Sequence, residues 1–581
     1  MGQWGTLTWS NRLAEKQGAF TFVLHSHIPY CRGAGRWPHG EEWLHEAAAE
    51  TYVPLLSALY DLRAEGVAFA ATIGLTPVLV EQLRDPLVNQ HFAEYLDQRI
   101  RAAASDGDRH RAAGTTELAS LADFYRARYS RVLSEYENRF RRDLMAAFRE
   151  LQDSCQVEIA TSAATHGYLP LFERDSTVAA QVATGVAAYE GAFGRRPHAI
   201  WLPECAYRPP YVAGSGEDAY EKPGLEVFLD EQGLRVFFTE TQTVEAGRAI
   251  GKSAGDAIGL YGGTPRRSPP LVVHAEPGRH TTFEAYRVGD ANVAVLGRNA
   301  HTGLQVWSAE HGYPGDHRYR EFHKKHERSG LQYWRITGAG VDLADKDIYQ
   351  PAEAAVQVED HARHFVALVE QEIASYYRAT GRYGIVVAAY DTELFGHWWF
   401  EGVDWLREVL RLLASSEVVD LVTASEFVEL HPPEHAVALP ESSWGQGGDH
   451  STWLTAGTEW MWASIHLAER RMERIVARYP HASGATSQVL AQAGRELLLL
   501  ESSDWPFLAT TGQARDYAVE RFKGHEERFR QLADVLEHGS VDPDAAAVAA
   551  TLFERDRVFA AIDYQMFRNR ERSLAGAGSP A

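Results

Sequence analysis

Short apolar runs alternate with longer amphipathic, helix-like segments through the first two-thirds of the chain. The runs are rich in β-branched and aromatic residues, which is typical of buried strands. They are Phe20–Leu24, Val67–Ile73, Val157–Ala160, Ala199–Leu202, Arg235–Thr239, Asn292–Leu296 and Ile385–Tyr390. Strands that alternate with helices predict an α/β fold with a parallel sheet, and a barrel is the natural closure for seven of them.

Polar or ionisable residues follow several of these runs at their C-terminal ends. In the stretch AIWLPECAY (Ala199–Tyr207), Pro203 stops an apolar run and Glu204 follows it. Far downstream, Asp391 follows the last apolar run directly. Other residues in this position are His25, Thr161, Glu240 and Arg298. Parallel α/β sheets carry their chemistry at the C-terminal ends of the strands, so we expect these side chains to share one functional rim.

Changes of pattern divide the chain into predicted domains. The charge-rich segment 87–152 has a helical pattern and is expected to be a helical insertion. A stretch over residues 247–270, rich in Gly, Arg and Pro, is expected to form a long loop with Tyr261 near its tip. After Val422 the pattern becomes helical. The predicted division is an N-terminal extension (1–19), a catalytic barrel (20–425), a helical C-terminal domain (426–545), and a final helix with a disordered tail (546–581).

Composition narrows the classes of partner. The 581-residue chain has a formal net charge of −22, which repels nucleic acid and anionic membranes and suits a neutral polysaccharide. Its three cysteines, Cys31, Cys155 and Cys205, have no metal-like spacing and do not predict a disulfide framework. The N-terminal segment has no apolar signal core, and no stretch is long enough to span a bilayer. We therefore expect a cytoplasmic protein.

Glu204 and Asp391 are the first candidates for chemistry. A retaining enzyme that cleaves sugar bonds needs one carboxylate as nucleophile and another as acid and base, about 5–5.5 Å apart. Alternatively, each acid caps a helix or pairs with a cation. Aromatic and histidine neighbours favour a functional role; they are Trp201, Tyr207, His397, Trp398 and Trp399. Glu393 competes with Asp391 for the second role, and the sequence alone does not choose between them.

Histidines form a second candidate site. His25 and His27 follow the first predicted strand as H-x-H, a spacing at which both imidazoles can face a barrel mouth. One interpretation is a metal pair of the amidohydrolase type, with His166 as a third ligand. A second is hydrogen bonding to sugar hydroxyls, and a third is structural histidines that bond to the backbone. No other Cys or His cluster in the sequence completes a convincing metal shell.

Four of the fifteen tryptophans, Trp37, Trp307, Trp444 and Trp453, lie in polar, loop-like surroundings. A tryptophan flanked by Gly, Ser and Asp more often presents a flat face to a ligand, and sugar rings stack on such faces. Any single one is more typical of packing. The set of four favours a carbohydrate site.

Five segments together resemble glycoside hydrolase family 57, specifically its 1,4-α-glucan branching enzymes. In order they are HSHIPY (His25–Tyr30), EIATSAATHGYLPL (Glu158–Leu171), WLPECAY (Trp201–Tyr207), YDTELFGHWWFEG (Tyr390–Gly402) and SSDWPFLATTGQA (Ser502–Ala514). The resemblance covers most of residues 20–540. It implies a (β/α)7 barrel with a helical insertion and an all-helical C-terminal domain.

The resemblance also implies roles for individual residues. Glu204 would be the nucleophile and Asp391 the acid/base. Expected substrate contacts are Arg298, Gly315, Trp444, Asp504 and Gln513, and the expected lining of the donor cleft is His25, His27, His166, Trp307 and Trp453. Trp37, His397 and Trp398 are further substrate-binding candidates from their aromatic or histidine-rich surroundings. The resemblance brings no metal and no other cofactor.

The implied reaction is a double displacement that cuts an α-1,4 link of a glucan and forms an α-1,6 branch. Tyr261 would exclude water from the intermediate, although its loop is longer than is usual in the family. The expected partner is an α-glucan of the glycogen type, and a monomer is expected. Rival interpretations are a family 57 α-amylase or 4-α-glucanotransferase, a metal-dependent deacetylase or amidohydrolase, and a non-catalytic glucan-binding protein.

Overall fold

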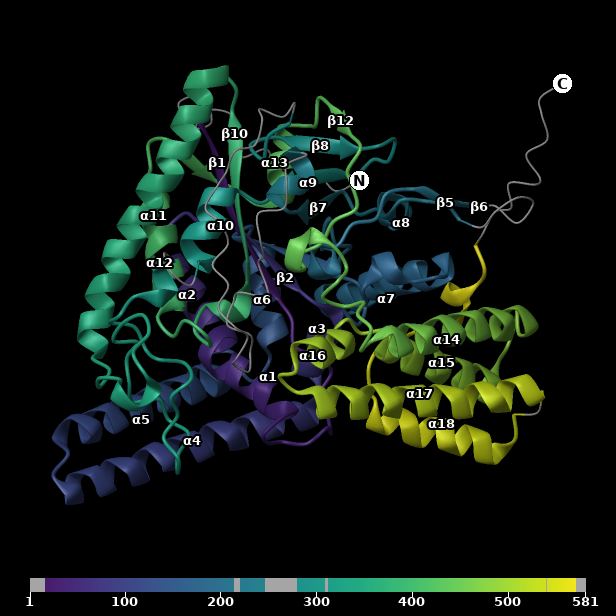
Figure 1. Ribbon diagram of the computed structural model, residues 1–581, viewed down its shortest axis with the longest axis horizontal. Coiled ribbons are helices and arrows are strands. Elements are labelled where there is room, and N and C mark those ends of the chain that lie inside the picture. Colours follow the sequence, from purple (N-terminus) through teal and green to yellow (C-terminus); the bar gives the residue numbers. More distant parts are fainter. Residues whose placement is uncertain (1–15, 214–219, 246–279, 309–311, 540, 571–581) are drawn as a thin grey trace.

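A computed structural model of the chain describes residues 16–213, 220–245, 280–308, 312–539 and 541–570. Its centre is a curled sheet wrapped by helices, with a further group of helices packed at one end (Figure 1). The strands in spatial order are β10 (Gly384–Asp391), β1 (Gly18–Ser26), β2 (Ala71–Leu75), β3 (Val157–Ser162), β4 (Ala199–Trp201), β7 (Val236–Thr239), β9 (Ala294–Gly297), β8 (Ala285–Val288) and β12 (Ala436–Val437). A tenth strand, β11 (Val419–Leu421), also pairs with β1.

The strands from β10 to β9 are parallel neighbours and correspond to the seven predicted runs. Beyond β9 the sheet continues through the antiparallel β8, so no ladder joins β9 to β10 within the described residues. Two backbone hydrogen bonds of 2.9 Å cross this opening, from Asn299 N–H to the Val387 carbonyl and from Ile385 N–H to the Phe283 carbonyl. The expected barrel is thus a curled sheet whose last seam is bridged without regular pairing.

Side chains alternate between the two faces of this sheet, as the period of two requires. On β1, Phe20 and Phe22 pack toward the helices, whereas Ala19 and Val23 fill the interior. The interior residues of β10 are Ile385, Val387 and Ala389. The same parity carries His25 and Asp391 to the interior side at the C-terminal rim.

Helices cover the outer face of the sheet. They are α1 (Glu41–Ala47), α2 (Val53–Ala64), α3 (Pro77–Arg84), α6 (Leu144–Asp153), α7 (Asp175–Phe193), α8 (Leu225–Glu231), α9 (Thr241–Glu245), α10 (Ala300–Trp307), α11 (Pro351–Thr380) and α12 (Gly402–Leu413). In contrast, α13 (Ala424–Leu430) packs Ala424 and Phe427 against the interior residues of the sheet. A small two-stranded sheet, β5 (Tyr211–Ala213) with β6 (Tyr220–Lys222), stands apart.

The helical insertion is a long antiparallel pair, α4 (Pro86–Ala113) and α5 (Thr116–Ser134), that extends away from the sheet at the lower left of Figure 1. The sequence sets both ends of α4. The Asp85 carboxylate accepts the N–H groups of Leu87 and Val88 at its start, where Pro86 occupies the first turn. Gly114 ends the helix in the left-handed conformation.

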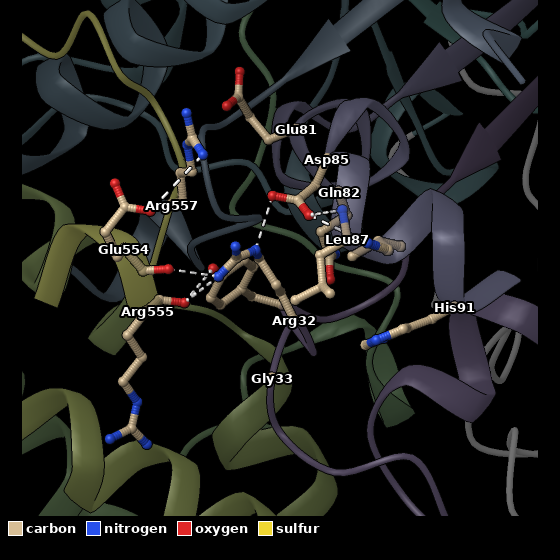
Figure 2. Close-up of polar contacts among 12 residues, drawn as sticks. Arg32, Gly33, Glu81, Gln82, Asp85, Leu87, His91, Glu554, Arg555 and Arg557 are labelled. Atoms are coloured by element: carbon tan, nitrogen blue, oxygen red, sulfur yellow. Dashed lines mark hydrogen bonds and ion pairs between the residues drawn. The ribbon is translucent and has the colours of Figure 1, made fainter. Parts of the chain in front are cut away.

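The C-terminal group consists of α14 (Glu459–Arg478), α15 (Gly484–Leu500), α16 (Asp504–Thr511), α17 (Arg515–His538) and α18 (Pro543–Arg555). Arg32 ties this group to the sheet (Figure 2). Its Nε donates to the Asp85 carboxylate at 2.8 Å, and its Nη1 donates to the carbonyls of Glu554 at 2.7 Å and Arg555 at 2.8 Å. We call this set of contacts the Arg32 clamp.

The predicted fold class is confirmed, including the helical insertion and the helical C-terminal region, while the domain boundaries stay a prediction. Among the described residues, no helix combines the length and apolar character that crossing a membrane requires.

Candidate active site

Glu204 and Asp391 lie at the same rim of the curled sheet. Asp391 ends β10 and is the register partner of His25 on β1, and Glu204 follows β4 directly. Both acids also lie close enough to the thiol of Cys205 to influence its pKa. The pKa of the buried Cys205 thiol is well above its usual value, chiefly through burial and the charge of Glu240, and the charges of Asp391 and Glu204 add to the shift. Two acids far apart in the sequence therefore face one small region.

Glu204 has an unusual backbone conformation. It sits in a 3-10 turn, Pro203–Cys205, with φ of 59°, and Cys205 follows with φ of 50°. Left-handed conformations cost a non-glycine residue about 1–3 kcal/mol, and they persist where the surroundings hold them. Here the Trp444 N–H donates to the Glu204 carbonyl at 2.8 Å. In this turn the backbone leaves the extended conformation of β4, so Glu204 does not continue the strand.

A directed chain of hydrogen bonds ends on the Glu204 carboxylate. The Ser503 hydroxyl donates to Glu204 Oε1 at 3.4 Å, so its oxygen accepts from His166 Nδ1 at 2.9 Å. With its hydrogen on Nδ1, His166 accepts at Nε2 from His25 Nε2, 3.1 Å away. We call these residues the His25–His166–Ser503 chain. A carboxylate that accepts a hydrogen bond is stabilised in its ionised form.

The imidazoles of this chain are neutral. Burial lowers the pKa of His25 well below its usual range, and His27 adds to the shift. Burial also lowers the pKa of His166, with contributions from His27 and His25. The assignment of one hydrogen to each ring is consistent with these directions.

His27 connects the sheet to the C-terminal helices. Its Nε2 lies 3.1 Å from both carboxylate oxygens of Asp504, the first residue of α16, and its Nδ1 lies 3.1 Å from Thr76 Oγ1. The His27 ring stacks on His166 with 4.0 Å between centroids, and His25 stacks on Trp201 at 4.8 Å. Among the described residues, the clusters whose His, Cys, Asp or Glu atoms converge as metal ligands lie elsewhere, so the geometry does not favour the metal interpretation of H-x-H.

The two acids that compete for the second role differ in environment. Glu393 is buried; it accepts a short hydrogen bond from the Tyr52 hydroxyl and one of 3.1 Å from the His27 N–H. Burial raises the pKa of Glu393 to about 8, with a contribution from the charge of Asp391 and against the hydrogen bond from Tyr52. Asp391 is partly exposed. The geometry therefore favours Asp391 as the acid that reaches a substrate.

Arg298 lies at this rim in a fixed position. Its Nη2 is 2.9 Å from Glu240 Oε1, and its guanidinium lies 5.4 Å from the centroid of the Trp444 ring. Its Nε and Nη1 are buried without a hydrogen-bond partner. Its charge reaches the thiol of Cys205, where it opposes the rise in pKa. Arg298 therefore belongs to the same region as the two acids.

The tryptophans that were expected to bind sugar differ in how far they are buried. Trp444 and Trp453 are buried, which corrects the expectation of exposed faces. Trp453 stacks on Tyr168 with 4.4 Å between centroids, and Trp444 meets Trp201 edge-on at 4.8 Å. Polar flanking residues did not reveal that the rings pack inward.

Three further tryptophans keep some exposure. Trp307 and Trp398 are half-buried and lie edge to face at 6.4 Å. Trp37 is 78% exposed in the loop between β1 and α1.

The remaining candidates are scattered. His397 is buried, with its Nδ1 3.8 Å from Glu50 and its carbonyl accepting from Arg320 at 3.2 Å, so it packs behind the rim. Gly315 is exposed in the 3-10 turn Tyr313–Gly315, and Gln513 is half-buried after α16. Tyr261 lies outside the described residues.

Ser503 is the site residue that sequence reasoning missed. It lies in the segment SSDWPFLATTGQA, next to the predicted Asp504. Serine is common at helix starts, so its presence there carried no chemical signal. Its contact with His166 depends on tertiary structure, in which the Ser503 N–H also donates to the His166 carbonyl at 3.2 Å.

Comparison with known proteins identifies the family. Residues 21–440 match glycosyl hydrolase family 57, and the chain belongs to this family. Residues 464–567 match a second family, described as 1,4-alpha-glucan branching enzyme, C-terminal.

Relatives of known function and structure cover nearly the whole chain. A 1,4-alpha-glucan branching enzyme from Thermococcus kodakarensis is 46% identical over 548 residues, which span 94% of this chain and 77% of that protein. Its crystal structure has a TM-score of 0.86 and covers 95% of this chain and 96% of that chain. The branching enzyme from Pyrococcus horikoshii is 41% identical, with a TM-score of 0.84 over 95% of this chain and 97% of that one. An alpha-amylase from Thermotoga maritima is 28% identical, with a TM-score of 0.80 over 95% of this chain and 99% of that one.

Proposed function

We infer that the protein is a 1,4-α-glucan branching enzyme. It cleaves an α-1,4 glucosidic link in a glucan and transfers the released chain to a glucose 6-hydroxyl, which forms an α-1,6 branch. Its membership of family 57, its matching C-terminal family and its branching-enzyme relatives support this function. The structural observation that carries it is the pair of acids at one rim, with a hydrogen-bond chain that ends on one of them.

In the proposed mechanism Glu204 is the nucleophile and Asp391 the acid/base. The Glu204 carboxylate attacks the anomeric carbon while Asp391 gives its proton to the departing glycosidic oxygen. The covalent glycosyl-enzyme is then attacked by a 6-hydroxyl whose proton returns to Asp391. The Ser503 hydroxyl stabilises the ionised nucleophile before the first step. We propose Arg298 as a further substrate contact at the rim.

Transfer rather than hydrolysis requires that water be kept from the intermediate. We propose Tyr261 for this role on sequence grounds, since it lies near the tip of a long predicted loop. Replacing it with Ala should raise hydrolysis relative to branching. An unchanged ratio of the two products would remove Tyr261 from this role.

Product analysis on amylose tests the function directly. Proton NMR of amylose incubated with the enzyme should show new α-1,6 signals as α-1,4 signals decline. Glu204→Gln should lower both branching and hydrolysis by about a thousandfold or more, because removing the covalent nucleophile removes the two-step path. Near-normal turnover in this variant would exclude Glu204 as nucleophile. Glutamine keeps the size of the side chain, and circular dichroism checks that the variant folds.

The similarity to the Thermotoga maritima alpha-amylase supports a second candidate, an α-amylase. In that case the NMR experiment would show loss of α-1,4 signals and new reducing ends without α-1,6 signals. A 4-α-glucanotransferase would instead redistribute chain lengths at constant α-1,4 content.

For the setting of the enzyme, we propose a cytoplasmic monomer that acts on a glycogen-type glucan. Light scattering after gel filtration should give the mass of one chain. A dimer mass that persists on dilution would contradict the monomer.

A further inference from the structure

One carboxylate and two imidazoles converge away from the rim, where α4 meets the segment 316–350. Asp106 and His110 are one turn apart on α4 and share a face of the helix, and His326 comes from the segment. One potential ligand atom from each of the three lies within 4.8 Å of the others. His326 Nδ1 is 3.6 Å from Asp106 Oδ2 and 3.1 Å from Ser329 Oγ, so a bound ion would replace the contact with the serine.

The hydrogen bonds of Thr115 fix which nitrogen of His110 is free. The Thr115 hydroxyl has one hydrogen and donates it to the His110 carbonyl at 3.2 Å. It therefore accepts from His110 Nδ1, which is 3.0 Å away, and Nδ1 carries the hydrogen of the ring. Nε2 then presents a lone pair, and this atom is buried with no hydrogen-bond partner.

Asp106 is a prepared anionic ligand. The Tyr333 hydroxyl donates to its Oδ2 at 2.8 Å, and Arg109 pairs with its Oδ1. Partners of this kind orient ligating carboxylates in known metal sites. The Arg109 side chain is 33% exposed, so it can turn toward solvent when a cation arrives.

We propose that Asp106, His110 and His326 bind one Zn²⁺ ion per chain. Two imidazole nitrogens and a carboxylate oxygen suit zinc and not magnesium or calcium, which take mostly oxygen ligands. In a tetrahedral site, zinc bonds of about 2.0–2.2 Å place two ligand atoms about 3.3–3.6 Å apart. The 3.6 Å between His326 Nδ1 and Asp106 Oδ2 lies at the upper end of this range. A water molecule completes the tetrahedron.

The bound ion would join α4 to a segment that also reaches the rim. Arg320 of this segment holds Glu50 with two hydrogen bonds of 3.1 and 2.9 Å and donates to the His397 carbonyl. The role of the metal is therefore structural. It fixes the helical insertion against the segment that supports the rim, and it does not enter the glucan chemistry.

The test uses the full chain without an affinity tag that binds metal. After treatment with EDTA and dialysis, zinc is titrated in competition with a chromophoric chelator, and thermal unfolding is followed with and without zinc. Wild type should bind one equivalent and unfold at a higher temperature with zinc, because a ligand that binds the folded state stabilises it. His110→Ala should bind zinc at least tenfold more weakly and lose the thermal shift. His317→Ala, an exposed histidine of the same segment, is the matched control and should behave as wild type.

Two outcomes would overturn the proposal. One is wild type that binds no zinc at 100 times the protein concentration, and the other is His110→Ala with unchanged zinc affinity. If His110→Ala does not fold, Asp106→Asn and His326→Ala replace it, and at least one folded variant must show the weaker binding. Cobalt substituted into wild type gives an independent reading, since an absorption band typical of tetrahedral coordination is expected and an octahedral spectrum would contradict the site.

Discussion

At the scale of single residues, Ser503 connects two parts of the chain through one hydroxyl. It accepts from His166 at 2.9 Å and donates to Glu204 at 3.4 Å. Removing this hydroxyl takes the acceptor from His166 Nδ1, which is buried and needs one. The proposed nucleophile therefore depends on a side chain that performs no bond-making itself.

Ser503→Ala should lower kcat by about tenfold, because a lost donor and an orphaned buried N–H cost about 1–3 kcal/mol between them. The acidic limb of the kcat/KM profile should move to higher pH, since a carboxylate that loses a donor is harder to ionise. Rates are measured from branching of amylose across pH. Thr511→Ala, which removes a hydroxyl at the other end of α16, serves as the control and should change kcat less than twofold.

An unshifted pH profile in Ser503→Ala would show that the serine acts through packing alone. A full loss of activity with altered circular dichroism would point to misfolding, in which case Ser503→Thr should restore most of the rate.

Glu393 predicts a particular dependence of stability on pH. Its pKa is raised to about 8 in the folded state, from 4.5 in the unfolded chain, chiefly by burial. Between these values the folded protein binds more protons than the unfolded one, so this group makes stability fall as pH rises from about 4.5 to 8. Glu393→Gln removes the titrating group and should gain stability relative to wild type by about 5 kcal/mol across this window.

Urea unfolding of both proteins at pH 5, 6, 7 and 8 measures the difference. Equal slopes of unfolding free energy against pH in the two proteins would contradict a protonated Glu393.

At the scale of elements, the Arg32 clamp joins three segments: the loop after β1, the start of α4 and the end of α18. The Asp85 side chain is 4% exposed and that of Arg32 11%, so their ion pair is largely shielded from water. The same guanidinium satisfies two carbonyls at the end of α18. Its removal leaves a buried carboxylate without its cation and takes a donor from two carbonyls, of which that of Arg555 keeps the Tyr30 hydroxyl at 3.4 Å.

Arg32→Ala should lower the free energy of unfolding by about 3 kcal/mol, as is typical when one partner of a buried ion pair is removed. Arg36→Ala is the control in the same loop. Its pair with Glu94 has side chains that are 48% and 42% exposed, so a loss below about 1 kcal/mol is expected. Urea unfolding checks both, and equal effects of the two substitutions would contradict the clamp.

The sequence allowed the core strands to be predicted because they are buried on both faces and read as continuous apolar runs. β8, β11 and β12 were not predicted. They are four, three and two residues long, and they lie at one end of the sheet or beside its main path. The run Val67–Ile73 was placed too early, since the strand is Ala71–Leu75. Apolar composition alone does not show where a loop becomes a strand.

Some features of the candidate site could likewise be predicted from the sequence, and others could not. The position of Glu204 and Asp391 at one rim could be predicted because strand ends are visible in the sequence, while their catalytic roles stay a prediction. The burial of Trp444 and Trp453 and the contact of Ser503 with Glu204 could not be predicted, because each depends on which distant segment packs against it.

At the scale of the whole molecule, the rim is completed from the C-terminal helices. Asp504 bonds to His27, Ser503 bonds to Glu204, and the backbone of Trp444 holds the strained turn. The curled sheet supplies the acids, and the helical region supplies the groups that hold them. The two parts therefore form one functional unit.

A chain that ends at residue 458 should lack measurable branching, at or below about 1% of wild type, because it loses Ser503 and Asp504 along with the helices that cover the sheet. Co-expression with a second polypeptide covering 459–581 should restore part of the activity. Branching is followed by the iodine stain of amylose. Full activity in the shorter chain would show that the helices only stabilise the fold.

The contact between Ser503 and Glu204 joins residues that are 299 positions apart in the sequence. This separation sets the order in which the two residues appear during synthesis. At about 5–20 residues per second, a ribosome needs roughly 15–60 s after making Glu204 before it reaches the serine. Throughout that interval the emerging polypeptide carries its proposed nucleophile without the donor that prepares it. We therefore expect an unfinished molecule that lacks Ser503 to be less active toward glucan than the complete chain.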